Sequence, residues 1–296
     1  MGSLTVREFE KKYPKVRFHS EYEGSSKSGD ALSIRFLGTA GFVFATDSRT
    51  IVADPYLNRS NFQSVLNNMP LDPRDNDSKA FSENKRIDVA DYIGPVDDVI
   101  IGHSHYDHIL DAPWLVKSHQ ARIIGSPTSI WMAKAAWKSF GWEPTPGHYV
   151  ITKGNETISC GENGDSVRGI PSRHAPQVGG IVKRLVPAAQ KWMTRNWEPP
   201  PWREDPIYYD AENGILFPGV ISDEEGEKMN WPLNAIDFPE GNTLDWSIRL
   251  GGHHLVHVDS ADYDPSQFGA NTLHGQADVL CLCAIGLNKY LKDHPE

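Results

Sequence analysis

The sequence predicts a mixed α/β fold for its 296 residues. Short apolar runs rich in β-branched and aromatic residues fill residues 32–57. Runs with strand and helix character then alternate from residue 97 to residue 176, and strand-like runs return from residue 243 onward. Because this alternation is the pattern of α/β proteins, we expect sheets that are covered by helices.

The elements follow in order along the chain. Residues 1–30 are polar and are interpreted as a helix or an arm, and consecutive strands and hairpins are predicted in "LSIRFLGTAGFVFATDSRTIVADPYL". Residues 58–90 are polar without a clear period, which is typical of an inserted loop. A buried strand is predicted in "DDVIIG" and a helix in "DAPWLVKSH", and the alternation continues through "ARIIGSP", "SIWMAKAAWKSFG", "HYVITKG" and "VRGIPSRHAP".

A second irregular segment, residues 181–244, mixes tryptophan, tyrosine and proline with few regular periods. We interpret it as a long excursion over the surface or over a cleft. Its aromatic side chains would either wall a pocket for an apolar or cyclic substrate or pack the excursion onto the body of the protein. The pocket interpretation names Trp192, Trp197, Trp202 and Tyr208 as substrate-binding residues. Strands are predicted again in "TLDWSIRLGG", "HHLVHVDSADY" and "ADVLCLCAIG", so we expect one domain over residues 1–296 with insertions near 58–90 and 181–244.

Composition excludes some classes of partner. The formal net charge of -10 argues against a surface that binds nucleic acid or anionic lipid, so a small-molecule substrate is expected. No stretch has the length of a membrane span or the form of a signal peptide. Cys160, Cys281 and Cys283 are predicted to be buried thiols, which favours a cytoplasmic location. The sequence does not indicate an oligomeric state.

A cluster of histidine and aspartate lies in "VIIGHSHYDHILDAP", residues 99–113. Alternate side chains of an extended chain share a face, so His103, His105 and Asp107 are expected to converge, with His108 reaching inward from the next helix. Imidazole and carboxylate groups are ligands of divalent metals, and the spacing suits a pair of ions. Zn²⁺ is the default, and Mn²⁺ or Fe²⁺ fits a carboxylate-bridged pair as well. The alternative is a solvent-exposed turn that binds no metal and in which the aspartates cap the following helix.

The segment "HSHYDH" resembles the H-x-H-x-D-H signature of the metallo-β-lactamase superfamily. Similarity in order and spacing extends over most of residues 32–286. The opening strands resemble those of the family and end in Asp54, His174 in "IPSRHAP" matches a further histidine ligand, and Asp259 in "HHLVHVDSADY" matches a bridging aspartate. The resemblance implies a four-layer αββα sandwich with the site along one edge of the paired sheets.

The resemblance also implies a ligand set. One ion would be held by His103, His105 and His174, and the other by Asp107 and His108, with Asp259 between the two ions. Asp54 would contact the metal ligands and hold them in position without binding an ion itself. Asp107 would additionally be the catalytic residue, which orients the attacking water and accepts its proton.

This sequence departs from the family pattern after Asp259. There the family continues through a strand, a helix and a second strand that carries the last histidine of the second metal site. "ADVLCLCAIG" matches the first of these strands, while His274 and His294 both fall before the expected position. His257 is the one candidate for a replacement, although a role in the core is the preferred interpretation.

The predicted function is therefore that of a metal-dependent hydrolase, dinuclear, acting on a small ester, lactone or phosphodiester. The opening strands and "VDSADY" look most similar to the branch with lactonase-like and N-acylphosphatidylethanolamine phospholipase D-like enzymes. One alternative is a non-catalytic binding protein that retains the fold with an impaired site. A TIM-barrel amidohydrolase also places H-x-H after a strand, but here strand-rich sequence precedes the motif and no eightfold alternation is visible.

Overall fold

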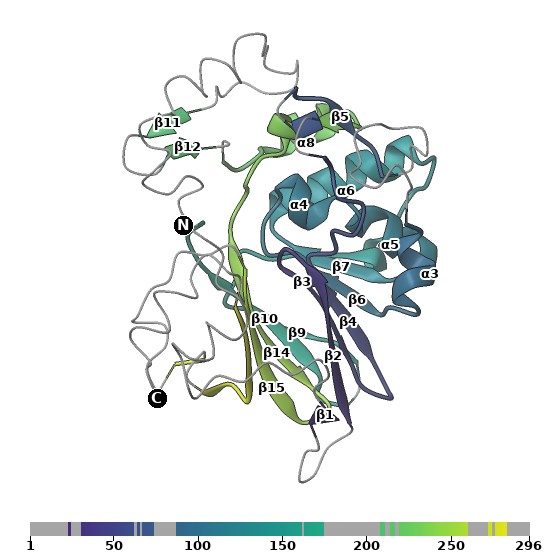
Figure 1. Cartoon of the computed structure of the whole chain (residues 1–296), viewed down its shortest axis with the longest axis vertical. Helices are drawn as coiled ribbons and strands as arrows, with labels where there is room; N and C mark the ends of the chain where they lie inside the picture. The colour runs from purple at the N-terminus through teal and green to yellow at the C-terminus, as the bar shows by residue number, and fades with distance from the viewer. Residues whose placement is uncertain are drawn as a thin grey trace.

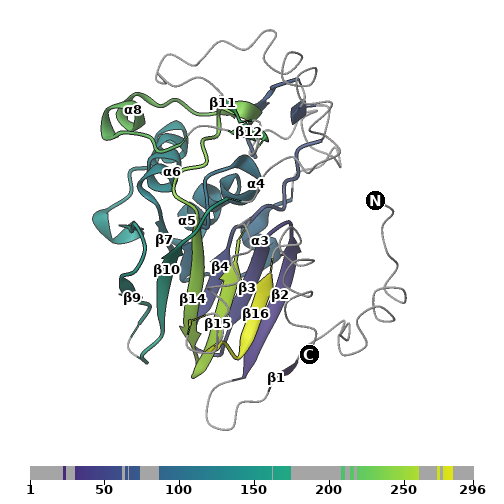
Figure 2. The same ribbon diagram turned by 90° about the vertical axis from the view of Figure 1, so that its left-hand side faces the viewer.

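Two β-sheets face each other, and helices cover the outer face of the first (Figure 1). This computed structural model describes residues 23–24, 31–61, 64–65, 67–73, 87–161, 163–174, 208–210, 214–216, 219–259, 272–273 and 276–282. The mixed α/β fold is confirmed, and the helix layer and both sheets of the predicted αββα arrangement are present. Within these ranges, helices lie on the outer face of the first sheet only (Figure 2).

The first sheet has seven described strands in the order β1-β2-β3-β4-β6-β7-β8. Neighbours from β1 to β4 are antiparallel, whereas β4, β6, β7 and β8 are mutually parallel. The strands are β1 (Glu23–Gly24), β2 (Leu32–Gly38), β3 (Gly41–Ala45), β4 (Thr50–Ala53), β6 (Asp98–Ile100), β7 (Arg122–Gly125) and β8 (Tyr149–Ile151). The parallel half matters most for function, because its carboxyl ends meet at one edge of the sheet.

The second sheet has the order β16-β15-β14-β10-β9. All its neighbours are antiparallel except β15 and β16, which are parallel. The strands are β9 (Thr157–Ser159), β10 (Ser166–Pro171), β14 (Leu244–Leu250), β15 (His253–Val258) and β16 (Val279–Leu282). The runs predicted from "TLDWSIRLGG", "HHLVHVDSADY" and "ADVLCLCAIG" are β14, β15 and β16.

The helices that cover the first sheet follow from local signals. They are α3 (Val89–Ile93), α4 (Tyr106–Ile109), α5 (Ala112–His119) and α6 (Pro127–Ser139). Ser126 caps α6 by accepting a hydrogen bond from the backbone N–H of Ser129, and Pro127 occupies the first turn, where its missing N–H costs nothing. The indole of Trp137 donates to the carbonyl of Pro113 at 2.8 Å, which ties α6 to α5.

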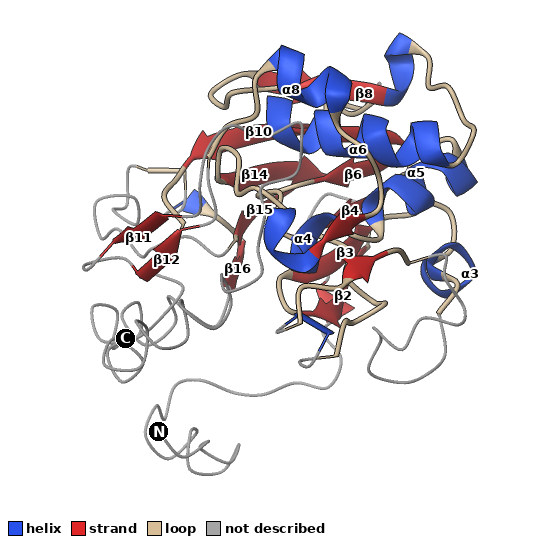
Figure 3. Ribbon diagram, turned by 90° about the horizontal axis from the view of Figure 1, so that it is seen from above, coloured by secondary structure: helices blue, strands red, loops and turns tan. Residues whose placement is uncertain are grey.

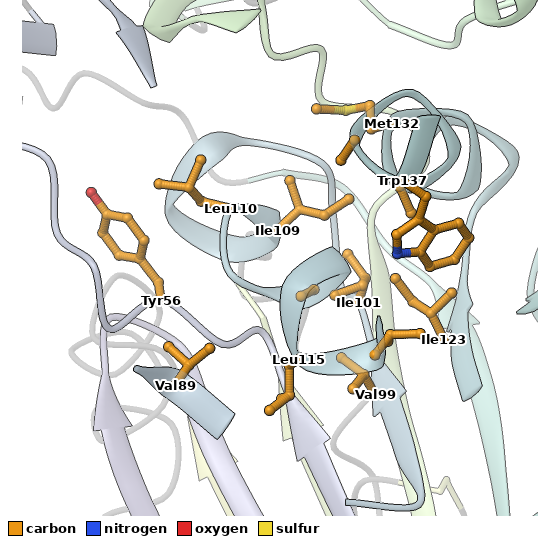
Figure 4. Packing of buried hydrophobic residues seen from close by; sticks show 14 of the residues in the cluster. Tyr56, Val89, Val99, Ile101, Ile109, Leu110, Leu115, Ile123, Met132 and Trp137 are labelled. Carbon is orange, nitrogen blue, oxygen red and sulfur yellow. The ribbon is translucent and has the colours of Figure 1, made fainter. Parts of the chain in front are cut away.

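Side chains of β6 alternate between two apolar cores. Val99 and Ile101 pack under the helices, where Figure 4 shows them beside Leu115 and Ile123, while Ile100 points into the layer between the sheets. This alternation is the period of a strand that is buried on both faces. The loop that follows β6 therefore starts from a rigid base.

The two predicted insertions meet in space. Strand β5 (Pro70–Leu71) pairs with β13 (Leu233–Asn234), and both leucines are buried in the core beneath the helices. Trp231 and Phe238 join the same core with their ring centroids 5.6 Å apart, so this part of the aromatic segment packs onto the body. Figure 3 shows α8 (Asp223–Lys228) beside α6. Two further short strands, β11 (Tyr208–Asp210) and β12 (Gly214–Leu216), pair with each other.

Asp98 ties the two sheets together. Its buried carboxylate accepts hydrogen bonds from Arg49 and Arg122, each at 2.7 Å. Arg122 also donates to the backbone carbonyl of Ser159, in β9 of the second sheet, at 2.9 Å. The aspartate thereby anchors an arginine that bridges the two sheets.

Replacing Asp98 with asparagine is expected to lower the free energy of unfolding by about 3 kcal/mol, because two partly buried guanidinium groups lose their counter-ion. Urea denaturation would measure the change. The matched control is Asp47→Asn, in an exposed turn, which should change stability by less than about 0.5 kcal/mol. Equal stability of the two variants would show that the buried pairs contribute nothing.

Among the described residues, no helix combines the length and apolar character that crossing a bilayer requires.

Candidate metal centre

The histidine cluster lies where β6 ends and α4 begins. His103 and His105 are on the loop after β6, and His105 takes an extended backbone conformation as the residue that precedes the helix. Asp107 and His108 lie in the single turn of α4. All three histidines are buried, whereas the side chain of Asp107 is 35% exposed.

The other predicted ligands approach from separate strands. Asp54 follows β4, whose carboxyl end lies beside that of the parallel strand β6. His174 follows β10 and Asp259 follows β15, so both come from the second sheet. The site is therefore assembled at one edge of the two paired sheets, as the resemblance implies.

His103, His105 and His174 form one group. The ring centroids of His103 and His105 lie 4.5 Å apart, and that of His174 lies 4.6 Å from His103 and 4.9 Å from His105. Nε2 of His103 lies 2.9 Å from Nδ1 of His105. Nitrogens of all three rings lie within 4.8 Å of one another, which places them around one volume.

The carboxylate of Asp259 links this group to the second. Nδ1 of His103 donates to one of its oxygens at 2.5 Å, and Nδ1 of His108 lies 2.9 Å from the other. Nε2 of His108 lies 3.8 Å from Asp107. The structure thus brings the predicted ligands of both ions together, with Asp259 between them.

Asp54 lies closer to the ligands than a purely supporting role suggests. One of its oxygens accepts a hydrogen bond from the backbone N–H of Gly102 at 2.7 Å, which fixes the loop that carries the histidines. Its other oxygen lies 3.4 Å from Nδ1 of His108. Asp54, His108 and Asp259 also form a group whose ligand atoms could surround one ion.

The protonation states of the candidate ligands suit a bound cation. Burial lowers the pKa of His103 to about 4 and lowers that of His105 well below its usual value, so both imidazoles are neutral near pH 7. Burial alone would raise the pKa of Asp259, but His103 and His108 together lower it well below its usual value. Neutral imidazoles beside an ionised carboxylate are the protonation states that metal ligands need.

His108 is the exception. Burial would lower its pKa, but the carboxylates of Asp259, Asp107 and Asp54 raise it well above its usual value. Burial and the charge of Asp259 raise the pKa of Asp54 to about 6. In the protein without metal, a proton on His108 balances this buried negative charge.

A divalent cation could supply the same charge, so the residues present fit a metal. We expect zinc binding at pH 7 to release about one proton, because an ion that binds His108 must displace it. Calorimetric titration in buffers of different ionisation enthalpy would count the protons. Affinity should rise with pH for the same reason. An equal release in a His108→Gln variant would contradict the assignment.

His257 lies in the core beside the centre, with its Nε2 4.0 Å from the carboxylate of Asp54. Its Nε2 donates to the carbonyl of Ala40 at 2.8 Å, and its ring meets those of Phe42 and Phe44 edge-on between the sheets. This is the core role that the sequence favoured. His274 and His294 lie outside the described residues.

The proposed substrate-binding aromatics are not placed at the site. Trp192, Trp197 and Trp202 lie outside the described residues, and the structure describes only the backbone of Tyr208, at the start of β11.

Sequence reasoning missed two residues beside the centre. The backbone carbonyl of Glu240 accepts from the N–H of Ser104 at 2.8 Å. Burial raises the pKa of the Glu240 carboxyl, and His174 opposes that shift. Asp111 accepts hydrogen bonds from the backbone N–H groups of Leu57 and Asn58 at 2.6 and 2.9 Å, which holds the loop after Asp54. Asp111 lies in the same stretch as the cluster, whereas no sequence signal distinguishes Glu240.

Neither a family model nor a curated protein sequence matches this chain. Among solved structures, the metallo hydrolase Igni18 from the archaeon Ignicoccus hospitalis is 12% identical, and the match covers 88% of this chain and 76% of that chain with a TM-score of 0.42. The metallo-β-lactamase fold protein YhfI from Bacillus subtilis is 13% identical over 88% of this chain and 67% of its own, with a TM-score of 0.35. CmlA, a diiron β-hydroxylase from Streptomyces venezuelae, is 14% identical over 83% of this chain and 32% of its own, with a TM-score of 0.39. The candidate metal centre is assigned from the residues of this chain itself.

Proposed function

We propose that this protein is a metal-dependent hydrolase with two ions, one held by His103, His105 and His174 and the other by Asp107 and His108. The observation that supports this proposal is the buried carboxylate of Asp259, whose two oxygens lie 2.5 Å from His103 and 2.9 Å from His108. A carboxylate in this position joins the two groups of ligands. Zinc is the preferred metal, with manganese and iron as the alternatives.

Divalent ions at such a site supply Lewis acidity, which polarises a carbonyl or phosphoryl group and acidifies water. The residues of the chain divide the remaining work. Asp107 is the carboxylate of the cluster that solvent reaches, which supports the proposal that it orients the attacking water and accepts its proton. His103 and Asp259 are fully buried and fix the geometry.

Competing nucleophiles are disfavoured by their surroundings. Ser104 is fully buried, and its hydroxyl is hydrogen-bonded to that of Ser129 at 2.8 Å. Burial raises the pKa values of the Cys160 and Cys281 thiols to about 12, so neither thiol ionises near neutral pH. Hydrolysis by activated water remains the chemistry that the described residues support.

The substrate class we propose is a small ester, lactone or phosphodiester, in line with the lactonase-like and phospholipase D-like branch. The test combines elemental analysis of the purified protein with turnover of 4-nitrophenyl acetate, γ-butyrolactone and bis(4-nitrophenyl) phosphate. We expect about two ions per chain and turnover of at least one substrate that a chelator abolishes. Bound metal without any turnover would instead favour a non-catalytic binding protein.

A further inference from the structure

A cavity of about 590 Å³ lies at the carboxyl ends of β7 and β8. Pro127, just after β7, and Ile151, at the end of β8, both line it. Because β6, β7 and β8 are parallel, this is the edge of the sheet at which the histidine loop follows β6. Two strand spacings separate β6 from β8, or roughly 10 Å. Ligands of α/β sheets bind at this edge.

One segment of chain borders both the cavity and the metal centre. The carbonyl of Glu240 accepts from Ser104, between the metal-ligand histidines, while the N–H of Gly241 donates to Gly219 at 3.0 Å. Asn242, the next residue, lines the cavity. A ligand that lies along this segment would reach from one site to the other.

The wall of the cavity is mostly apolar. Besides Pro127 it includes Ile151, Val220 and Ile221. Ile151 is 49% exposed and Val220 is 57% exposed, which are high values for large apolar side chains. Apolar groups exposed inside a concavity suit an apolar part of a ligand.

The polar groups of the cavity favour an anion. Lys153 is the one basic side chain in the lining, and its ammonium group has no ion pair with any residue that the structure describes. Asp223 is the one acidic side chain in the lining, and it already accepts a hydrogen bond from the Trp131 indole at 2.9 Å.

We propose that the cavity binds the acid part of the substrate, a short apolar chain that ends in a carboxylate paired with Lys153. A single ammonium suffices for a carboxylate, whereas a phosphate is commonly held by several donors. This proposal rests on the proposed hydrolase function, because it places the scissile group at the metal centre and the anionic end in the cavity two strands along the same edge of the sheet. The substrate would then be the half ester of a short dicarboxylic acid.

The test measures binding rather than turnover. Hexanoate and the neutral hexanamide would be titrated into the zinc-loaded full chain and followed by saturation-transfer NMR. We expect hexanoate to bind about fivefold more tightly than hexanamide, as one exposed ion pair allows. Lys153→Met should remove this preference, and the exposed Lys138→Met should preserve it. Val220→Glu, also at an exposed position, should weaken both ligands by about fivefold.

A carboxylate can also bind a metal directly, so the same titrations would be run on His105→Ala. The preference for hexanoate should persist in that variant. Loss of the preference for hexanoate in His105→Ala would overturn the assignment of the cavity. So would a preference that survives in Lys153→Met, or hexanamide binding that is unchanged in Val220→Glu. If hexanoate binding depends on Lys153 but the protein shows no hydrolytic activity, the proposed function is wrong. The cavity is then still a binding site for a carboxylate.

Discussion

Replacing His105 with alanine is expected to abolish metal-dependent hydrolysis, with a loss of about a thousandfold or more in kcat/KM. His105 offers a neutral imidazole to the group that it forms with His103 and His174, and no other described side chain joins that group. Removing it leaves two nitrogens and a carboxylate that would be shared with the second ion, one ligand fewer than the proposed site supplies. The fold should survive, because the residue lies on a loop at the edge of the sheet.

Three measurements on the His105→Ala variant would test this expectation. Elemental analysis would show the lost ion, turnover would show the lost activity, and circular dichroism would show the retained fold. The matched control is His119→Ala at the end of α5, which should keep both metal and turnover. Chelator-sensitive turnover at the wild-type rate in His105→Ala would defeat the assignment of the site.

The second large effect is expected at Gly102. A methyl group built on this residue would lie 2.7 Å from Cβ of Asp259 and closer still to its carboxylate. Neither Gly102 nor Asp259 can move easily to relieve this contact. Gly102 is held by hydrogen bonds to Asp54 at 2.7 Å and from Leu244 at 2.8 Å, and Asp259 is fully buried. Gly102→Ala should therefore displace the carboxylate that joins the two groups of ligands.

We expect Gly102→Ala to weaken zinc binding by about a hundredfold and to lower the free energy of unfolding by about 2 kcal/mol. Competition with a chromophoric chelator and urea denaturation would measure the two effects. Gly147→Ala is the control, because its added methyl group would have its nearest neighbour 3.9 Å away. Wild-type zinc affinity in Gly102→Ala would show that Asp259 does not contribute to the site.

Much of the fold could be predicted because strand and helix periods are local properties. The strand before the cluster, helix α6 and the return to strands in β14 and β15 all follow from apolar spacing and capping residues. The cluster itself is equally local, since His103 to His108 span one strand end and one helical turn.

The remaining features depend on contacts between distant segments. Nothing in "FPEGN" indicates that Glu240 accepts a hydrogen bond from the loop at Ser104. The sequence of residues 181–244 leaves open whether an aromatic side chain walls a pocket or packs onto the body, and the ring of Trp231 packs in the core. The pairing of β5 with β13 joins two segments that were both interpreted as insertions, and a two-residue ladder leaves no sequence pattern.

The separation of His103 from Asp259 by 156 residues bears on the order in which the protein matures. During synthesis the amino-terminal part emerges first and carries the compact histidine motif without the carboxylate and histidine of the second sheet. Such a nascent chain would hold ions loosely and exchange them with its surroundings. The ligands of the proposed site are complete only when β10 and β15 dock, so ions bound there would favour the docked state by mass action. The proposed site would thus be completed by the joining of the two sheets, and tight metal loading would follow that step.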